Sequence, residues 1–474
     1  MNVSRTTSNG PLALLARLAA GALVAATVAA CAATSVPGDS GAPPSAEPTL
    51  LGSPTSDSTD SLPSADADTP GASVSLGPIP TLPAVSTGDW TGIEWVAGPA
   101  PAAATTPNDP EDTYSLFSWS GGYVGFRTTV DTSPDAAPWT ITTTSSVSPD
   151  GLRWQDGGRL ESDYSGIYVD GLVESPDGLV AVGRPMGALM CACYTRKSVS
   201  AMWTSKDGLH WTPIDMKSAF GFSQTSVSGV VFDVVAGTSG YVAVGTTVPV
   251  AAGVPDEGIP ASASIWLSDD GRSWRQVALP QTMFKDVYFA QAIAFGGAYF
   301  VAGSIGWPET DTDEGDEYAT TTPALWRSTD GTTWQRVALS GMTAGPVSVL
   351  SLTAIAGQTL VATISGQDPV GSTRPVWVTS DGIAWTRTTA KSNNASILTH
   401  GRRSLLLPST LGPRSEPDIA ALDPQLHPSS LSQTGDRPLD LWASGTWVAA
   451  LGPTGLVVTD QFGTRMWVGV PTGH

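Results

Sequence analysis

The chain has 474 residues, and its 23 Lys and Arg against 43 Asp and Glu give a formal net charge of −20. A chain with this excess of negative charge repels anionic partners. The composition therefore argues against non-specific binding of nucleic acid or of anionic lipid surfaces. We therefore expect no nucleic-acid partner, and no motif calls for a cofactor.

Residues 1–30 have the pattern of an export signal. Arg5 and Arg17 precede a 13-residue apolar run that ends at Ala30, and this run is too short to span a membrane. The run ends in Val28-Ala29-Ala30-Cys31, which resembles a bacterial lipobox. The resemblance implies that Cys31 is lipidated and anchors the chain to the outer face of the cell membrane. The alternative is ordinary cleavage near Ala30, with Cys31 incidental.

Residues 31–88 form a predicted linker. They contain six acidic residues, no Lys or Arg, and many Ser, Pro, Ala and Thr. Such a segment buries too little apolar surface to order itself, and Pro and like charge keep it extended. We expect it to hold a folded domain, residues 89–474, away from the membrane.

A motif of the form [Ser/Thr]-x-Asp-Gly-x-x-Trp occurs five times in that domain. The distances between successive tryptophans are 57, 63, 60 and 51 residues, which indicates a repeat architecture. Asp-Gly between apolar runs favours a tight hairpin, because Gly accepts positive φ and Asp bonds nearby backbone N–H groups. The Asp and Trp positions of the five copies are Asp150 and Trp154, Asp207 and Trp211, Asp270 and Trp274, Asp330 and Trp334, and Asp381 and Trp385.

Four copies carry a second Trp eight residues before the first, at Trp203, Trp266, Trp326 and Trp377. The pairs are centred on the Asp, so we predict that the two indoles face each other across the hairpin. We assign the motif a structural role rather than a ligand-binding one.

The motif resembles the Asp-box, or bacterial neuraminidase repeat, although it lacks the residue that usually separates Asp and Gly. The resemblance implies an all-β fold, a β-propeller in which each box lies between the third and fourth strands of a blade. Short apolar strands such as Gly240–Gly245 and Leu350–Ile355 agree with four-stranded antiparallel blades, and no helical periodicity follows residue 31. Counting gives seven blades, with six or eight as alternatives.

The last two blades lack a clear motif. A sixth, residues 394–432, has strands only, and Thr459 to Trp467 is interpreted as a decayed copy in the seventh. Gly92 to Trp95 has the form of a motif end without its beginning. A first strand that completes the last blade would explain this segment and close the ring.

The connections between second and third strands are predicted to be long and dissimilar, over residues 128–145, 184–199, 247–262, 304–323 and 365–374. They emerge on the face opposite the motif turns, and variable loops on a rigid scaffold commonly carry binding sites. The candidate ligand contacts are the loop aromatics Trp139, Tyr194, Trp307 and Tyr318. The alternative is that each loop packs its own aromatic residue beneath itself.

Two further groups have chemical potential. The acidic loop Asp311, Asp313, Asp316 and Glu317 offers oxygen ligands for Ca²⁺ but lacks a complete ligand pattern, so a solvated loop is the favoured interpretation. Cys191 and Cys193 would tend to oxidise outside the cytoplasm, although a bridge across one residue is strained. We favour a local disulfide there over a redox or metal role.

The resemblance to sialidases raises the question of catalysis. Those enzymes use an arginine triad, a Tyr–Glu pair and an Asp acid, with the first arginine in Arg-Ile-Pro. Phe126-Arg127-Thr128 and Gly183-Arg184-Pro185 are the nearest segments, and neither fits. We therefore favour a non-catalytic envelope lipoprotein that binds a glycan or a protein through the loop face. The alternative is a diverged glycoside hydrolase, which would need two carboxylates flanking a pocket.

Overall fold

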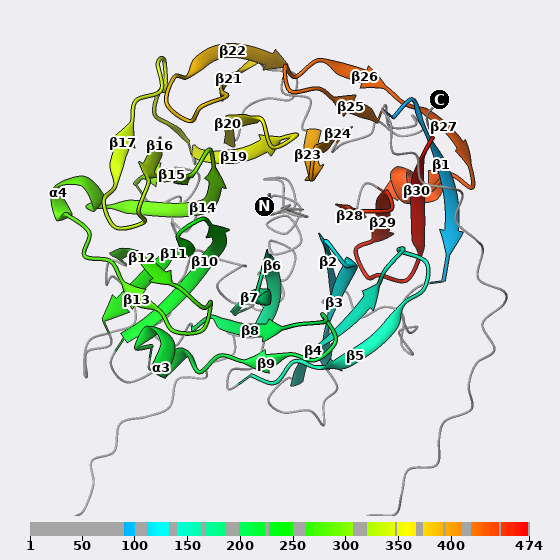
Figure 1. Cartoon of the computed structure of the whole chain (residues 1–474), viewed down its shortest axis with the longest axis horizontal. Coiled ribbons are helices and arrows are strands. Elements are labelled where there is room, and N and C mark those ends of the chain that lie inside the picture. The colour runs from blue at the N-terminus through cyan, green and yellow to red at the C-terminus, as the bar shows by residue number, and fades with distance from the viewer. Residues whose placement is uncertain are drawn as a thin grey trace, which may run out of the picture. The chain divides into compact units, whose positions relative to one another are not determined.

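In a computed structural model of the chain, the described residues are 90–99, 112–131, 140–162, 167–185, 199–222, 227–249, 262–306, 320–346, 348–365, 373–391, 395–408, 419–444 and 447–472. They form seven β-sheets arranged around a central axis as the blades of a propeller (Figure 1). The innermost strands of neighbouring blades contact one another all the way round, from the first blade to the seventh and back. The predicted all-β propeller and its seven blades are confirmed.

Each of the first six blades is an antiparallel sheet whose four strands run outward from the axis in chain order. Blade 1 consists of β2 (Thr113–Trp119), β3 (Gly122–Asp131), β4 (Thr140–Ser148) and β5 (Gln155–Arg159). Blade 2 consists of β6 (Ile167–Ser175), β7 (Gly178–Pro185), β8 (Ala201–Ser205) and β9 (Thr212–Pro213). Blade 3 consists of β10 (Val227–Gly237), β11 (Gly240–Pro249), β12 (Ser262–Ser268) and β13 (Arg275–Gln276). Blade 4 consists of β14 (Val287–Phe295), β15 (Ala298–Ile305), β16 (Thr320–Ser328) and β17 (Gln335–Val337), and the short strand β18 (Gly345–Pro346) pairs with β16. Blade 5 consists of β19 (Val349–Ile355), β20 (Thr359–Ser365), β21 (Thr373–Thr379) and β22 (Thr386–Lys391). Blade 6 consists of β23 (Ala395–His400), β24 (Arg403–Pro408), β25 (Ala420–Leu422) and β26 (Pro428–Ser430).

The seventh blade joins the two ends of the domain. Its strands are β28 (Trp447–Leu451), β29 (Leu456–Asp460), β30 (Met466–Thr472) and the first strand of the domain, β1 (Gly92–Gly98). β1 pairs antiparallel with β30 along its whole length, which confirms the predicted ring closure. A fifth strand, β27 (Ser432–Gly435), pairs in parallel with the outer edge of β1, and Trp95 Nε1 donates to Gln433 Oε1 at 3.0 Å. β1 is thus held along both of its edges.

The predicted motif turns join the third and fourth strands in blades 1 to 5, on one face of the ring. The interpretation of Thr459 to Trp467 as a decayed motif is wrong. That segment joins β29 to β30, the second and third strands, and so lies on the opposite face. In the seventh blade the third strand ends the described chain and the fourth begins it, so no continuous turn joins them.

The connections between second and third strands are shorter than predicted. In blade 1 the predicted loop covers residues 128–145, but both strands extend into it. β3 continues to Asp131 and β4 begins at Thr140. The same shortening occurs in blades 3 to 5, whose connections span 250–261, 306–319 and 366–372. In blade 2 the connection spans 186–200 and ends one residue later than predicted.

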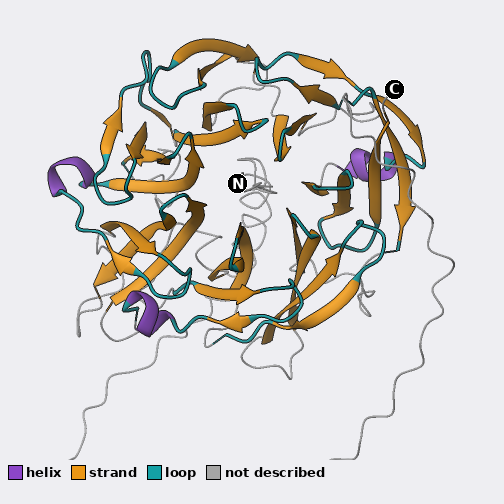
Figure 2. Ribbon diagram, viewed as in Figure 1, coloured by secondary structure: helices purple, strands orange, loops and turns teal. Residues whose placement is uncertain are grey.

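Three short helices lie in the described chain, contrary to the expectation of none: α3 (Met216–Phe220), α4 (Gln281–Phe284) and α5 (Leu439–Ser444) (Figure 2). They are four to six residues long, too short for a helical period to show in the sequence. Helix α3 has Asp215 as its N-cap and Gly221, in a left-handed conformation, as its C-cap. None of the helices in the described part of the chain is long and apolar enough to cross a membrane.

Apolar side chains fill the seams between blades. The largest fully buried side chains include Trp203, Trp266, Trp326 and Trp377, all on third strands. Polar contacts also cross the seams. The hydroxyls of Tyr123, Tyr241 and Tyr299, each on a second strand, reach the turn between the first two strands of the preceding blade. Apolar packing and these hydrogen bonds together make the ring a rigid frame for its loops.

Candidate functional site

The five motif turns share one set of hydrogen bonds. In the copy at Asp270, the Gly271 N–H donates to Ser268 Oγ at 2.8 Å, and two further backbone N–H groups donate to Asp270 Oδ1 at 2.7 and 2.8 Å. These bonds favour the charged form and hold the pKa of the Asp270 carboxyl below its usual value. The same bonds recur in the other four copies. Each carboxylate thus closes its own turn.

The motif glycine and tryptophan complete the turn. Gly271 has φ of +72°, and a Cβ there would lie 3.1 Å from Val180 of the preceding blade, so a side chain at this position would meet both strain and a close neighbour. Trp274 Nε1 donates to Gly271 O at 3.2 Å. Its ring stacks on Phe220 of helix α3 at 5.2 Å between centroids.

The prediction that paired indoles face each other across the hairpin is wrong in register. Trp266 lies opposite Gln276, two residues beyond Trp274, and the three other copies show the same offset. Both indoles instead contact a third ring, Phe220, which belongs to the connection from the preceding blade.

A turn in blade 6 has similar carboxylate hydrogen bonds although its sequence lacks the motif. Asp423 follows β25, and its Oδ1 accepts from the backbone N–H groups of Gln425 and His427 at 2.9 and 2.8 Å. Leu426 takes the positive φ of +68° that Gly takes elsewhere. Because Ser, Gly and Trp are all missing, the sequence pattern could not reveal this turn.

The remaining predicted site residues lie outside the described residues. These are Cys31, the loop aromatics Trp139, Tyr194, Trp307 and Tyr318, the cysteines Cys191 and Cys193, and the acidic residues Asp311, Asp313, Asp316 and Glu317. Their roles stay predictions. Within the described ranges, no group of three His, Cys, Asp or Glu side chains could hold a metal ion.

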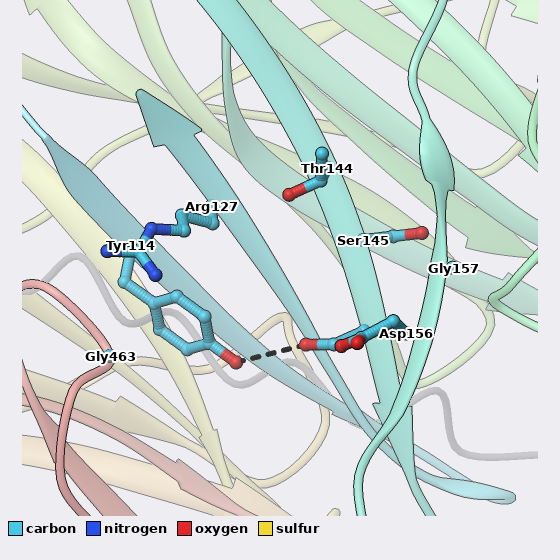
Figure 3. A pocket seen from close by; sticks show the side chains of 8 residues that line it. Tyr114, Arg127, Thr144, Ser145, Asp156, Gly157 and Gly463 are labelled. Carbon is cyan, nitrogen blue, oxygen red and sulfur yellow. Dashed lines mark hydrogen bonds between the residues drawn. The ribbon is translucent and has the colours of Figure 1, made fainter. Parts of the chain in front are cut away.

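A cavity of about 260 Å³ lies beside blade 1. It is lined by Tyr114, Arg127, Thr144, Ser145, Ser146, Asp156, Gly157 and Gly463 (Figure 3). Tyr114 lies near the start of β2, opposite Arg127 near the end of β3, and Gly463 lies in the β29–β30 turn of blade 7. These positions place the cavity at the seam between blades 7 and 1.

Two glycines make room for Tyr114. A Cβ on Gly125 would lie 1.7 Å from the Tyr114 hydroxyl oxygen, and one on Gly463 would lie 2.5 Å from its ring. The Tyr114 backbone N–H donates to Gln461 O at 2.9 Å, which ties β2 to the same turn of blade 7. The Tyr114 ring is therefore fixed between two blades.

The Tyr114 hydroxyl points toward Asp156 (Figure 3) and lies 3.3 Å from Ser146 Oγ, within hydrogen-bond distance. Burial disfavours the charged form and raises the pKa of the Tyr114 phenol well above its usual value. The phenol therefore keeps its proton at physiological pH and stays able to donate a hydrogen bond.

Arg127 is the cation among the described lining residues. Its Nη2 lies 3.9 Å from Asp112 Oδ2, and both side chains are mostly buried, with 14% and 10% of their surface exposed. Arg127 Nε and Ser145 Oγ are buried without a hydrogen-bond partner in the described structure. A buried polar atom without a partner costs free energy, which a ligand that bonds to it would recover.

Sequence reasoning considered Arg127 and set it aside, and it missed Tyr114 and Asp156. No short motif unites the lining, which comes from four strands of blade 1 and a turn more than 300 residues later in the chain. One signal was available: the run Thr140 to Ser148 is rich in Thr and Ser, where other third strands, such as β12 and β16, carry buried apolar residues.

No protein-family model and no curated protein matches the chain. Among solved structures, it is similar to a protein of unknown function from Dyadobacter fermentans, at 12% identity and a TM-score of 0.38 over 69% of this chain and 96% of that one. It is also similar to a family 117 glycoside hydrolase of Zobellia galactanivorans, at 12% identity and a TM-score of 0.32 over 69% and 88% of the two chains. A third is the Aleuria aurantia lectin in complex with alpha-methyl-L-fucoside, at 12% identity and a TM-score of 0.32 over 77% and 96%. Likeness at this level assigns neither an activity nor a ligand to this chain.

Proposed function

We propose that this chain is a glycan-binding propeller displayed on the outer face of a cell membrane. The observation that carries the proposal is the convergence of complementary polar groups in the cavity beside blade 1. Arg127 only donates hydrogen bonds, Asp156 only accepts them, and the hydroxyls of Tyr114, Thr144 and Ser146 can do both. A sugar hydroxyl also donates and accepts, so this mixture suits a ring that carries several hydroxyls.

The size of the cavity favours a sugar over a protein surface. At about 260 Å³, it is slightly smaller than the cavities of about 300 Å³ and above that hold drug-sized molecules. A stable protein interface buries about 800 Å² on each partner, which is far more than the walls of one small cavity offer. We therefore propose that one sugar unit, at the end or on a branch of a glycan, enters the cavity.

The cavity supports binding rather than cleavage. Hydrolysis by paired carboxylates needs two carboxyl groups on opposite sides of the scissile bond. Among the described lining residues, Asp156 supplies one carboxylate, and nearby Asp112 is paired with Arg127. Incubation with glycans that bind should therefore release no new reducing ends. Release that disappears in Asp156→Asn would instead establish a hydrolase.

Binding can be tested on the full mature chain with an immobilised glycan panel. Asp156→Asn replaces a charged hydrogen-bond acceptor by a neutral one. Because a charged hydrogen bond contributes about 1.5–3 kcal/mol and a neutral one about 0.5–1.5 kcal/mol, affinity should fall roughly fivefold to tenfold. Asp156 is exposed, and its replacement should leave the fold intact. The matched control is Asp177→Asn, an exposed position in a turn on the motif face. Equal loss in both variants, or loss in neither, would contradict the placement of the site.

The anchor is a separate part of the proposal and rests on the sequence Val28 to Cys31. If Cys31 carries the lipid, Cys31→Ala should move the protein from the detergent-extracted membrane fraction to the soluble fraction. Sugar binding by the soluble variant should be unchanged. If the variant stays associated with the membrane, the proposed lipid anchor is contradicted, and the proposed sugar-binding site is unaffected.

A further inference from the structure

The charges around the cavity indicate which sugars it accepts. Two arginines at or near the described lining already have a carboxylate partner. Arg127 lies 3.9 Å from Asp112, and Arg465, two residues after the lining Gly463, lies 3.6 Å from Asp460. Both carboxylates are mostly buried, with 10% and 11% of their side-chain surface exposed. Arg127 is buried as well, so solvent screens its pair only partly, whereas Arg465 is 50% exposed and its pair is screened more strongly. Neither arginine is left to balance the charge of an anionic ligand.

Among the described lining residues, the charge that remains is negative. Asp156 is exposed, lines the cavity, and forms no ion pair with any cation of the described structure. Arg159, the next cation along β5, lies opposite Thr144 but is exposed and does not line the cavity. The whole chain adds to the effect, because a net charge of −20 repels anions at longer range.

We infer that the cavity selects neutral sugars and rejects acidic ones. The inference rests on the proposed glycan binding and gives it a ligand class. A neutral pyranose can donate hydroxyl hydrogens to Asp156 and accept from Arg127 and Tyr114. A uronic acid of the same ring shape brings a carboxylate into a site whose uncompensated charge is already negative. Like charges at close range in a half-buried site cost enough to separate the two classes by about tenfold or more.

The test uses sugars that differ in one group. The probes are multivalent polyacrylamide conjugates of glucose and glucuronic acid, galactose and galacturonic acid, and mannose and mannuronic acid, offered to the full mature chain. We expect at least one neutral sugar to bind about tenfold or more tightly than its acid partner. Salt screens charge, so raising the NaCl concentration should narrow that ratio.

Substitutions then assign the selectivity to the cavity. Asp156→Asn should weaken binding of the neutral sugar and strengthen that of the acid, so the ratio of their affinities should shrink. The matched control is Asp177→Asn, which raises the net charge by one, as Asp156→Asn does, without altering the lining. In this control the ratio should stay at its wild-type value.

The outcomes separate the two proposals. If the acid of any pair binds as well as or better than its neutral partner, the selectivity is overturned while glycan binding stands. If no conjugate of either class binds, the proposed function falls, and the selectivity falls with it. If the neutral sugar is preferred but Asp156→Asn leaves the ratio unchanged, the selectivity does not arise in this cavity.

Discussion

Replacing Trp274 by Ala measures how much a motif tryptophan contributes to the fold. Trp274 is 9% exposed, its ring stacks on Phe220 at 5.2 Å, and it lies edge-on to Tyr241 at 6.2 Å. Truncation of a buried Trp to Ala costs about 3–5 kcal/mol. The lost hydrogen bond from Nε1 to Gly271 O, about 1 kcal/mol, falls within the uncertainty of that range. We expect a loss of about 4 kcal/mol.

The assay is thermal or denaturant unfolding of the full mature chain. Unfolding entropy of about 2.1 cal/mol/K per residue over the roughly 290 described residues is about 0.6 kcal/mol/K, so 4 kcal/mol corresponds to about 6–7 °C in Tm. The matched control is Trp154→Ala, the same motif position with the same indole hydrogen bond, at 2.9 Å, but with only partial burial.

Trp154→Ala should cost clearly less than Trp274→Ala, because the two sites differ in packing and not in the motif. A double-mutant cycle with Phe220→Ala should show coupling of about 0.5–1.5 kcal/mol, as expected for a stacked aromatic pair. Equal Tm losses for the two tryptophans, or zero coupling to Phe220, would refute the packing account.

Two further perturbations follow from the turns. Gly463→Ala should weaken sugar binding more than Gly221→Ala does. Both glycines have positive φ, but only a Cβ at Gly463 would clash with the Tyr114 ring, at 2.5 Å. Equal sugar binding in the two variants would show that the Tyr114 ring can shift without loss of affinity. Backbone hydrogen bonds from Thr333 and Thr332 lower the pKa of the Asp330 carboxyl in the folded state. The charged carboxylate therefore stabilises the fold fully above its unfolded-state pKa of about 3.9, and this stabilisation is lost as the pH falls through its folded-state pKa. Asp330→Asn should therefore destabilise at neutral pH and by progressively less below about pH 4, as followed by denaturant unfolding at several pH values; a pH-independent difference would contradict the role of the charge.

The repeated turns could be predicted because their physics is local. Ser, Asp, Gly and Trp lie within seven residues, and each turn satisfies its own hydrogen bonds, so spacing alone reveals blades 1 to 5. The cavity could not be predicted in this way. Tyr114, Arg127 and Asp156 come together only when β2, β3, β4 and β5 pair in that order, and Gly463 comes from the other end of the domain. Asp460 was assigned to the wrong face because a local pattern does not say which pair of strands a turn connects.

The double pairing of β1 affects how the ring closes as the chain folds. β1 comes first and its partner β30 last among the described strands, and the pair Gly92–Thr472 encloses nearly the whole domain. Closing so long a loop carries an entropic cost that grows slowly with length, and pairings this distant form slowly. β27 is made before β30 and offers β1 a parallel edge, from Gly92–Ser432 to Trp95–Gly435, before the last strand exists. An early partner of this kind keeps the first strand from presenting an open edge to other chains while it waits for the last.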